Sequence, residues 1–346
     1  MQGKGSIARI IAVFTVCISL IAYDLYGKLN RPPAAVLPEK ESSVFSGAGE
    51  TGAESPETEE NDPPAESKPQ NSAPTESSGN SSVAASAPGN VKGKITSRYI
   101  SPYTAPLSYN NVYVKNSAGV SLDIKSLLNA SLGFKLKKSD EPQVLIMHTH
   151  TTETYMTEDT DCYTDKYTSR TREKSRNMVS VGEIVAKKLN GAGIKTLHDA
   201  TEHDYPKYTG SYGRAAKTIN GYLKKYPSIK IVLDLHRDAL SSGSDKVKLV
   251  TEINGKKAAQ VMLVMGTSSP KWKENMKLAF KLQQMLEAKY PTLARPLSVT
   301  GSKYNQDLTT GSLLIEFGTD ANTLEEAHYS AQLVGDALVS LFNTLT

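Results

Sequence analysis

The stretch Val144-Leu-Ile-Met-His-Thr-His-Thr-Thr-Glu153 joins a short apolar run to two histidines and a carboxylate. Residues 144–147 predict a buried strand, and the polar residues after them fall in the loop beyond its carboxyl end, where open α/β sheets place their ligands. His150 and Glu153 have the H-x-x-E spacing, which lets an imidazole and a carboxylate on one turn bind the same ion. This loop is therefore expected to supply two ligands of a metal site.

Two later apolar runs also end at candidate residues. Residues 229–238 predict a buried strand that delivers His236, and residues 312–318 predict another that delivers Glu316. Three ligands from His and Glu, with one position left open, suit a catalytic zinc. Zinc lowers the pKa of a bound water to about 7, and a carboxylate that does not bind the metal can take the proton. The predicted ligands are His150, Glu153 and His236, and the predicted base is Glu316.

Other polar residues near these strand ends receive weaker assignments. His148 is expected to orient a ligand or to replace His150 as one. Arg237 is a candidate for binding a substrate carboxylate, with pairing to Asp238 as the alternative. A substrate loop is expected at Lys303, Tyr304, Asn305 and Gln306. The tyrosines and arginines between residues 155 and 176 either cover a glycan or close a loop. Three histidines outside the pattern are expected at the surface: His198, His203 and His328.

The order of the elements predicts an α/β fold with a mixed, mostly parallel sheet flanked by helices. Strands at residues 144–147, 194–197 and 229–238 alternate with helices, which gives a β-α-β-α-β order. Asn254-Gly255 between two apolar runs is a hairpin signal. Residues 95–129 are expected to form a subdomain or a lid. Helices are expected at residues 177–190, 213–225, 272–289 and 323–345, the last capped by Asp320 or Asn322.

The N-terminal residues 1–29 predict a membrane anchor. Lys4 and Arg9 precede an apolar run at residues 10–23, which is at the lower length limit for a spanning helix. A cleaved secretory signal is the alternative, but Leu20-Ile-Ala22 lacks the small-x-small cleavage pattern. Basic residues before the run and acidic residues after it place the body of the protein outside the cytoplasm. We therefore expect a single-pass membrane protein.

Residues 30–93 predict a disordered acidic linker, followed by one catalytic domain at residues 94–346. Residues 30–90 carry ten acidic and three basic side chains, which leaves a net charge of +11 on the rest of the chain. A basic body outside the cell favours a cell-wall polymer or a membrane surface as partner over nucleic acid. The two cysteines, Cys17 and Cys162, offer neither a disulfide framework nor a cysteine zinc site.

Four motifs, in order behind one anchor, resemble the family of stage II sporulation protein P. They are His-Thr-His-Thr-Thr-Glu at 148–153, Asp-Leu-His-Arg-Asp at 234–238, Lys-Tyr-Asn-Gln-Asp-Leu at 303–308 and Leu-Ile-Glu-Phe-Gly-Thr at 314–319. The resemblance runs from residue 94 to the C-terminus and leaves out the linker. The family consists of membrane-anchored cell-wall hydrolases that act in engulfment during endospore formation.

This resemblance implies a zinc-dependent N-acetylmuramoyl-L-alanine amidase with an amidase_3-type fold. Endopeptidase activity on peptide cross-links is also ascribed to the family. Peptidoglycan would be the substrate, and sporulation stage II proteins D, a lytic transglycosylase, and M, a membrane protein, would be partners. The location implied is between the mother-cell and forespore membranes.

Carried over to this sequence, the resemblance matches the first histidine ligand to His150 more naturally than to His148. It matches the second to His236 and the base to Glu316. The wider amidase class has its liganding glutamate at the start of the following helix, where this chain has Ser175-Arg-Asn-Met178. Glu153 is therefore the preferred ligand, with Glu173 in reserve.

Two other classes remain open at the level of sequence. A zinc carboxypeptidase-like enzyme would share the H-x-x-E spacing, but it needs an arginine in the pocket, for which Arg237 and Arg214 are the candidates. A non-catalytic wall-binding scaffold would keep the fold and lack a working ligand set. Preference for amide or cross-link, oligomeric state and dependence on partners are not encoded in any motif.

Overall fold

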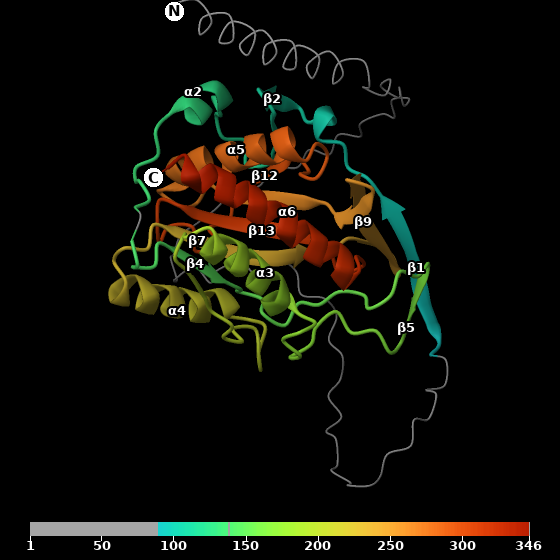
Figure 1. The fold of residues 1–346 in the computed structure, drawn as a ribbon. Coiled ribbons are helices and arrows are strands. Elements are labelled where there is room, and N and C mark those ends of the chain that lie inside the picture. The colour runs from blue at the N-terminus through green and yellow to red at the C-terminus, as the bar shows by residue number, and fades with distance from the viewer. Residues whose placement is uncertain (1–88, 138, 346) are drawn as a thin grey trace, which may run out of the picture. The chain divides into compact units, whose positions relative to one another are not determined.

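Two β-sheets organise the residues that the computed structural model describes, 89–137 and 139–345 (Figure 1). The larger sheet has eight strands in the order β2-β3-β12-β11-β13-β7-β4-β6. Its strands are β2 (Leu107–Tyr109), β3 (Val112–Asn116), β4 (Val144–Met147), β6 (Thr196–His198), β7 (Ile231–Asp238), β11 (Val261–Gly266), β12 (Leu297–Thr300) and β13 (Ser312–Thr319).

Most neighbouring strands of the larger sheet run parallel. Antiparallel pairing occurs only between β2 and β3 and between β11 and β13, while β3–β12–β11 and β13–β7–β4–β6 are parallel throughout. The predicted α/β class with a mixed, mostly parallel sheet is confirmed. The consequence for a site is that β4, β7 and β13 all end at the same edge of the sheet.

Helices cover both faces of this sheet, as expected for strands buried on both sides. Alternate residues of β4 point to opposite faces, so Val144 and Ile146 pack with one cluster and Leu145 and Met147 with another. The first cluster includes residues of α3, α5 and α6, and the second includes residues of α4. The helices are α2 (Ile124–Asn129), α3 (Met178–Gly191), α4 (Ser211–Lys225), α5 (Trp272–Lys289) and α6 (Leu324–Asn343).

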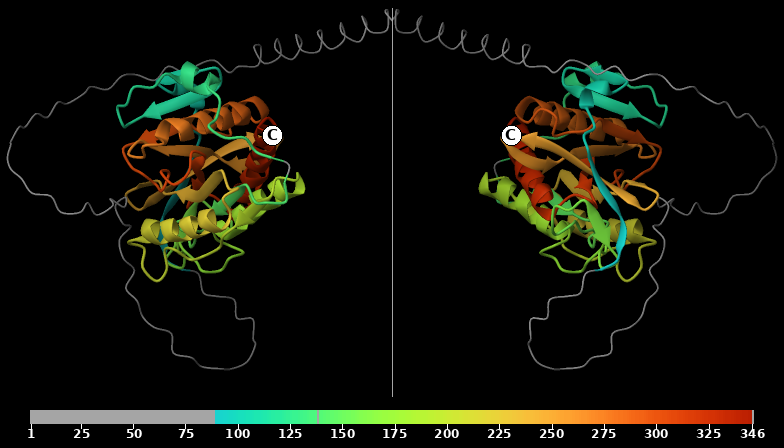
Figure 2. Two further views of the ribbon diagram at one scale, coloured as in Figure 1. Left: turned by 90° about the vertical axis from the view of Figure 1, so that its left-hand side faces the viewer. Right: turned by 90° about the vertical axis from the view of Figure 1, so that its right-hand side faces the viewer.

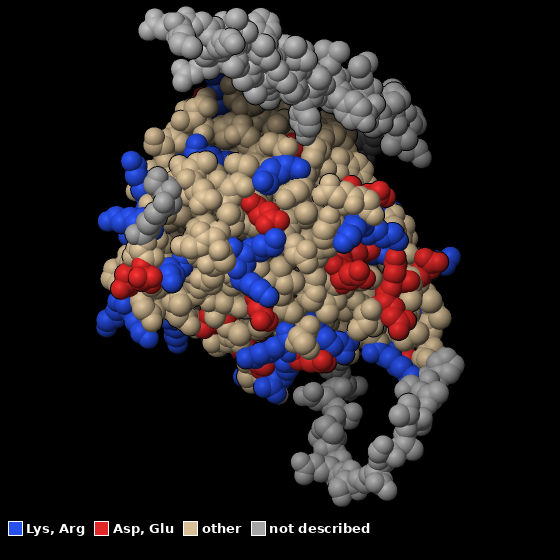
Figure 3. Space-filling model, in the orientation of Figure 1, with Lys and Arg blue, Asp and Glu red and all other residues tan. Residues whose placement is uncertain are grey.

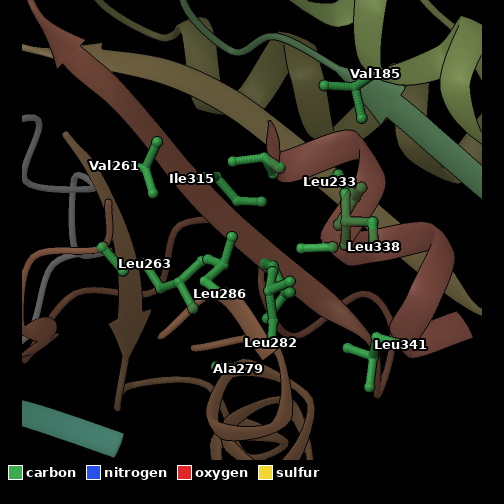
Figure 4. Close-up of a cluster of buried hydrophobic side chains, with 14 of the residues drawn as sticks. Val185, Leu233, Val261, Leu263, Ala279, Leu282, Leu286, Ile315, Leu338 and Leu341 are labelled. Carbon is green, nitrogen blue, oxygen red and sulfur yellow. The ribbon is translucent and has the colours of Figure 1, made fainter. Parts of the chain in front are cut away.

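The main core lies between the sheet and α3, α5 and α6. Leu282 of α5 and Leu338 of α6 point towards Ile315 of the central strand β13 (Figure 4). All three residues are 0% exposed. Burying one such side chain contributes roughly 1.5–3 kcal/mol to folding, so this layer holds the central strands in place.

Side-chain caps set where two of the long helices begin. The Asn177 side chain accepts from the backbone N–H of Val179 at the start of α3. At α6 the Thr323 side chain and Glu326 form a reciprocal capping box. The prediction that Asp320 or Asn322 caps this helix is therefore wrong. Asn322 instead accepts from the backbone of Thr319 and donates to Leu249, which joins the end of β13 to the smaller sheet.

The smaller sheet has the order β10-β9-β1-β5, with β8 pairing to β9. The hairpin predicted at Asn254-Gly255 is confirmed, because β9 and β10 pair antiparallel on either side of it. The strands of the smaller sheet are β1 (Val91–Arg98), β5 (Cys162–Thr164), β8 (Ser241–Ser242), β9 (Asp245–Ile253) and β10 (Lys256–Ala259). The predicted domain boundary after residue 93 falls inside β1, which runs along one side of the molecule (Figure 2).

Residues 95–129 do not form a separate subdomain or lid. Within them, β3 joins the larger sheet through parallel pairing with β12, and α2 packs beside α5. The short 3-10 helix η1 (Pro102–Thr104) connects β1 to the edge strand β2. The expectation fails because Val112 and Val114 are both fully buried and extend the main core.

The predicted anchor and nearly all of the predicted linker lie outside the described residues. Within residues 89–137 and 139–345, none of the helices is both long and apolar enough to cross a membrane. On the face seen in Figure 3, basic and acidic side chains alternate in small groups, so the net positive charge is not gathered there into one patch.

Candidate metal centre

The loop at residues 148–154 is almost entirely buried, and its threonines explain how it is held. Thr149 donates from its backbone and its hydroxyl to Asp234 of β7. The Thr151 hydroxyl donates to a backbone carbonyl at Thr201, and Thr152 donates to Asp204. A buried loop must satisfy its polar groups internally, and these side chains do so. The loop therefore presents its other side chains from a fixed frame.

Three side chains converge at the carboxyl ends of β4 and β7. His150, Glu153 and His236 are all buried, and one ligand atom from each lies within 4.8 Å of the other two. Nδ1 of His150 is 3.4 Å from Oε1 of Glu153, and Nδ1 of His236 is 3.6 Å from Oε2. Both imidazoles thus direct the same nitrogen at one carboxylate. The structure brings the three predicted ligands together into a group that could bind a metal.

Asp234 lies behind His236 on the same face of β7. Nε2 of His236 is 2.9 Å from Oδ1 of Asp234, although the angle is too poor for Nε2 to count as hydrogen-bonded. A carboxylate behind a liganding histidine fixes the ring and leaves the other nitrogen for the metal. Burial opposes the charged ring, but Asp234 and Glu153 raise the pKa of His236 well above its usual value. Metal binding at this group would therefore release a proton.

Aromatic rings and a hydroxyl enclose His150. Nε2 of His150 lies 3.1 Å from the hydroxyl of Ser211, the first residue of α4. The ring stacks on Tyr208, with 4.6 Å between centroids, and meets the edge of Tyr212 at 5.5 Å. These contacts leave Nδ1 as the nitrogen that faces Glu153.

Arg237 is placed behind Glu153. Its backbone N–H donates to Oε2 of Glu153 at 3.1 Å, and its guanidinium donates to the carbonyls of Thr154 and Ser169. Burial alone would raise the pKa of Glu153, but Arg237 and the two histidines hold it well below its usual range. Arg237 is 4% exposed. Its geometry fits support of the carboxylate, and its predicted contact with substrate stays a prediction.

Glu316 lies beside the group on β13. It pairs in register with His236 on the parallel strand β7, so both side chains leave the same face. The residue is partly exposed, but its Oε2 is buried and has no hydrogen-bond partner among the described residues. Burial, followed by the charges of Asp238 and Glu153, raises the pKa of Glu316 to about 8, although His236 opposes this shift. A carboxyl with such a pKa can both hold and release a proton near neutral pH.

His148 is not part of the converging group. Its Nδ1 donates to the carbonyl of Leu235, and its Nε2 lies 2.9 Å from Nε2 of His198. Burial and His198 lower the pKa of His148 to about 3, so the ring is neutral. The structure thus separates it from the site of His150. This arrangement supports the loop from the α3 side of the sheet.

The expectation that three histidines lie at the surface is wrong for His203 and does not describe His198 or His328. His203 is 1% exposed and joins the carbonyl of His148 to the hydroxyl of Thr218 on α4. His198 contacts His148, and His328 contacts the Ser180 hydroxyl. For His203 no signal was present in the sequence, because this residue lies in a loop and a buried loop residue carries no strand or helix periodicity.

The predicted substrate loop is anchored through the side chains of Asn305 and Gln306, whereas Lys303 and Tyr304 make longer contacts. The Gln306 side chain bonds to β11 backbone at Gly266 and Val264, and that of Asn305 donates to the carbonyl of Tyr212. Tyr304 and Asn305 both have φ values in the left-handed region, 53° and 54°. Such strain persists only where neighbours hold it. Tyr304 lies 6.0 Å from Tyr212, and the Lys303 ammonium is 3.9 Å from Asp307.

The group fits a zinc ion by its donor set. Two imidazole nitrogens and one carboxylate match the ligands of catalytic zinc with an open position. The site also has a carboxylate behind one histidine and aromatic rings against the other, and outer groups of these kinds tune such sites. The alternative ligand Glu173 is exposed and pairs with Arg176 instead.

Two residues of the site, Asp234 and Asp204, had no assigned role in the sequence interpretation, and Arg170 was expected only among the arginines that cover a glycan or close a loop. Asp234 supports His236, Asp204 supports Thr152, and Arg170 reaches both Asp204 and Glu153. For Asp234 a signal existed, because it stands two residues before His236 on one strand and must share its face. No local pattern connects Asp204 or Arg170 to the site, since loop closure alone brings them there.

Fold and site together define an α/β protein with a buried His-Glu-His group, at the ends of parallel strands, that could bind a metal. The family model of stage II sporulation protein P matches residues 27–339. The chain belongs to this family.

Individual relatives agree with that placement. Stage II sporulation protein P of Bacillus subtilis (strain 168) is 30% identical over 222 residues, which cover 60% of this chain and 53% of the relative. The chain thus matches about half the length of that curated relative.

Solved structures give weaker likenesses. The CwlD amidase from Clostridioides difficile, in complex with the GerS lipoprotein, has a TM-score of 0.39 and 10% identity, covering 59% of this chain and 98% of that one. The N-acetylmuramyl-L-alanine amidase Ami1 from Mycobacterium abscessus has a TM-score of 0.36 and 11% identity, covering 57% and 98%. A TM-score below 0.5 does not establish a shared fold.

Proposed function

We propose that this protein is a zinc-dependent peptidoglycan hydrolase that cleaves the amide between N-acetylmuramic acid and L-alanine. The observation that carries the proposal is the buried His150–Glu153–His236 group with Glu316 beside it on the neighbouring strand. The substrate class comes from the resemblance to the sporulation family. Peptide cross-links are the second class of bond to be tested, and the amidase_3 type of fold is part of the same proposal.

Each residue has a part in this reaction. Zinc, when bound, polarises a carbonyl and lowers the pKa of a coordinated water to about 7. His150, Glu153 and His236 would hold the ion, and Asp234 would orient His236. Glu316 removes a proton from the attacking water and returns it to the leaving amine, so the proton balance closes on one residue. A cation beside Glu316 would lower its pKa from about 8 towards neutrality, which suits both steps.

A zinc carboxypeptidase-like activity is less well supported. It would need an arginine free to hold a terminal carboxylate. Arg214 donates to the carbonyls of His203, Thr209 and Lys207, and Arg237 to those of Thr154 and Ser169. Both candidates are therefore engaged by backbone oxygens of surrounding loops.

The cellular setting is also a proposal. An anchor in residues 1–29 would tether the domain outside the cytoplasm, between the mother-cell and forespore membranes. Sporulation stage II proteins D and M are the partners that the family suggests. Cell fractionation of the full chain, with protease added to intact protoplasts, tests this topology directly.

Digestion of purified peptidoglycan by residues 89–346 tests the activity. Stem peptides released from intact glycan, lost with a chelator and restored by zinc, are expected, and mass spectrometry of the soluble products identifies the bond. Products cut only within the peptides would show that the protein is an endopeptidase and not an amidase. Absence of release by zinc-loaded protein would favour a scaffold or an enzyme that needs a partner.

A further inference from the structure

We propose that Arg170 binds the carboxylate of the stem peptide nearest the scissile amide, the α-carboxylate of the second residue, D-glutamate. The inference rests on the proposed function and deepens it. Arg170 lies in the loop that follows β5, far in sequence from the ends of β4 and β7 that carry the predicted ligands. Its backbone nevertheless forms an isolated β-bridge with that of Glu153. Its Nη2 lies 3.7 Å from Oε1 of Glu153. A positive charge therefore stands directly beside the predicted metal ligands.

The guanidinium of Arg170 is held on two sides. Its Nη1 donates to the buried carboxylate of Asp204 at 2.6 Å, and its carbon lies 4.6 Å above the ring of Tyr208. Tyr208 in turn stacks on His150. An arginine fixed by a salt bridge and an aromatic face loses little further freedom when it binds a ligand. The site is therefore built before substrate arrives.

Donors of Arg170 remain free for a ligand. Within the described residues, Nε and Nη2 make no hydrogen bond, since the contact to Glu153 is longer than one. The Arg170 side chain is 33% exposed, whereas that of Glu153 is 5% exposed. An ion on Glu153 would take up much of that carboxylate's negative charge and weaken its hold on Arg170. Nε and Nη2 would then be available to a ligand that reaches this partly exposed side chain beside Glu153.

A carboxylate is the ligand that this edge fits. Nε and Nη2 form a planar pair of donors that matches two carboxylate oxygens. Arg237 and Arg214 are engaged by backbone carbonyls, and Arg172 sits farther out on Tyr205 and Glu202. Of these four arginines, Arg170 alone combines partial exposure with a contact to a predicted metal ligand. The carboxylate closest to the scissile bond is the one within its reach.

Binding of two synthetic probes tests this inference. Both are N-acetylmuramoyl-L-Ala-γ-D-Glu-L-Lys with an amidated C-terminus; in one the D-glutamate α-carboxyl is free, and in the other it is amidated. Calorimetry would use zinc-loaded Glu316→Gln protein, so that neither probe is cleaved. We expect the free carboxylate to bind on the order of 10- to 100-fold more tightly.

Variants in the same background assign the preference. Arg170→Gln should bring the two affinities together, Arg170→Lys should retain part of the preference, and the matched control Arg172→Gln should leave it unchanged, all with equal zinc content. Equal affinity for the two probes, including no binding of either, overturns the inference. So does an Arg170→Gln variant that weakens both equally. If wild-type protein cleaves neither probe while the preference persists, the amidase proposal fails and the carboxylate site stands.

Discussion

Glu316 is the residue whose substitution should separate metal binding from hydrolysis. Glu316→Gln removes the proposed base but no ligand, so zinc content should stay the same while hydrolysis falls by about 10²- to 10⁴-fold. Zinc analysis and digestion of peptidoglycan measure the two properties. Glu173→Gln is the control, because Glu173 is exposed and pairs only with nearby loop residues. Loss of zinc from the Glu316 variant would instead make Glu316 a ligand.

The same residue should make the metal-free protein less stable as pH rises. Burial raises the pKa of Glu316 from 4.5 to about 8. Between these values the folded state keeps the proton and the unfolded state loses it, so stability falls with increasing pH. Urea unfolding at pH 5 and pH 8 with a chelator should show Glu316→Gln gaining on the order of a few kcal/mol relative to wild type at the higher pH. A constant difference between the two proteins at both pH values would refute this.

The candidate ligands that follow the strands could be predicted from the sequence, but the side chains that hold those ligands in place could not. His150, Glu153 and His236 could be assembled because each follows an apolar run that had to be a strand. His148 differs from His150 only by pointing to the other side of the loop, which the period of a strand does not decide once the strand has ended. Arg170 reaches the site through loop closure, and such contacts leave no trace in local spacing.

At the scale of elements, α3 packs so closely on the loop that one glycine is fixed by sterics. A Cβ at Gly182 would lie 2.6 Å from Nε2 of His148 and 2.5 Å from Nε2 of His198. Gly182→Ala should therefore cost about 1–3 kcal/mol, although alanine normally favours a helix interior. Gly221→Ala in α4 is the matched control, since nothing lies within 4 Å of its added Cβ. It should gain about 0.5–1 kcal/mol in urea unfolding. A gain of stability at both positions would show that His148 and His198 can move aside.

Element boundaries show where sequence patterns stop being sufficient. The apolar run at residues 258–266, the second of the two that flank Asn254-Gly255, divides at Gln260 into β10 and β11, which belong to different sheets. The Gln260 side chain bonds to the backbone of Ile100 and Thr292, which fixes the change of direction. Those partners are distant in sequence, so only the folded chain reveals the break. The long helix α5, in contrast, begins and ends at the predicted residues.

At the scale of the whole molecule, the smaller sheet braces the loop that carries Arg170. The chain leaves the site after Met156, pairs as β5 with β1, and returns to Arg170 beside Glu153. Ile95 of β1 packs with Met156, and its backbone N–H donates to the carbonyl of Asp161 in this segment. The strand that follows the predicted linker is thus connected physically to the candidate metal centre, which no motif in β1 would indicate.

Removal of β1 should therefore weaken metal binding as well as stability. A protein that begins at residue 99 loses the parallel pairing to β9 and the antiparallel pairing to β5, whereas one that begins at residue 89 keeps both. Without β1 the segment from residue 157 to 170 is expected to open, so that Arg170 and the backbone bond from Thr154 to Ser169 no longer hold the Glu153 turn. Zinc titration should show weaker binding by the shorter protein, together with a melting temperature lower by several degrees. A lower melting temperature with unchanged zinc affinity would show that β1 contributes to stability but not to metal binding. The geometry of the His-Glu-His group would then be independent of the smaller sheet.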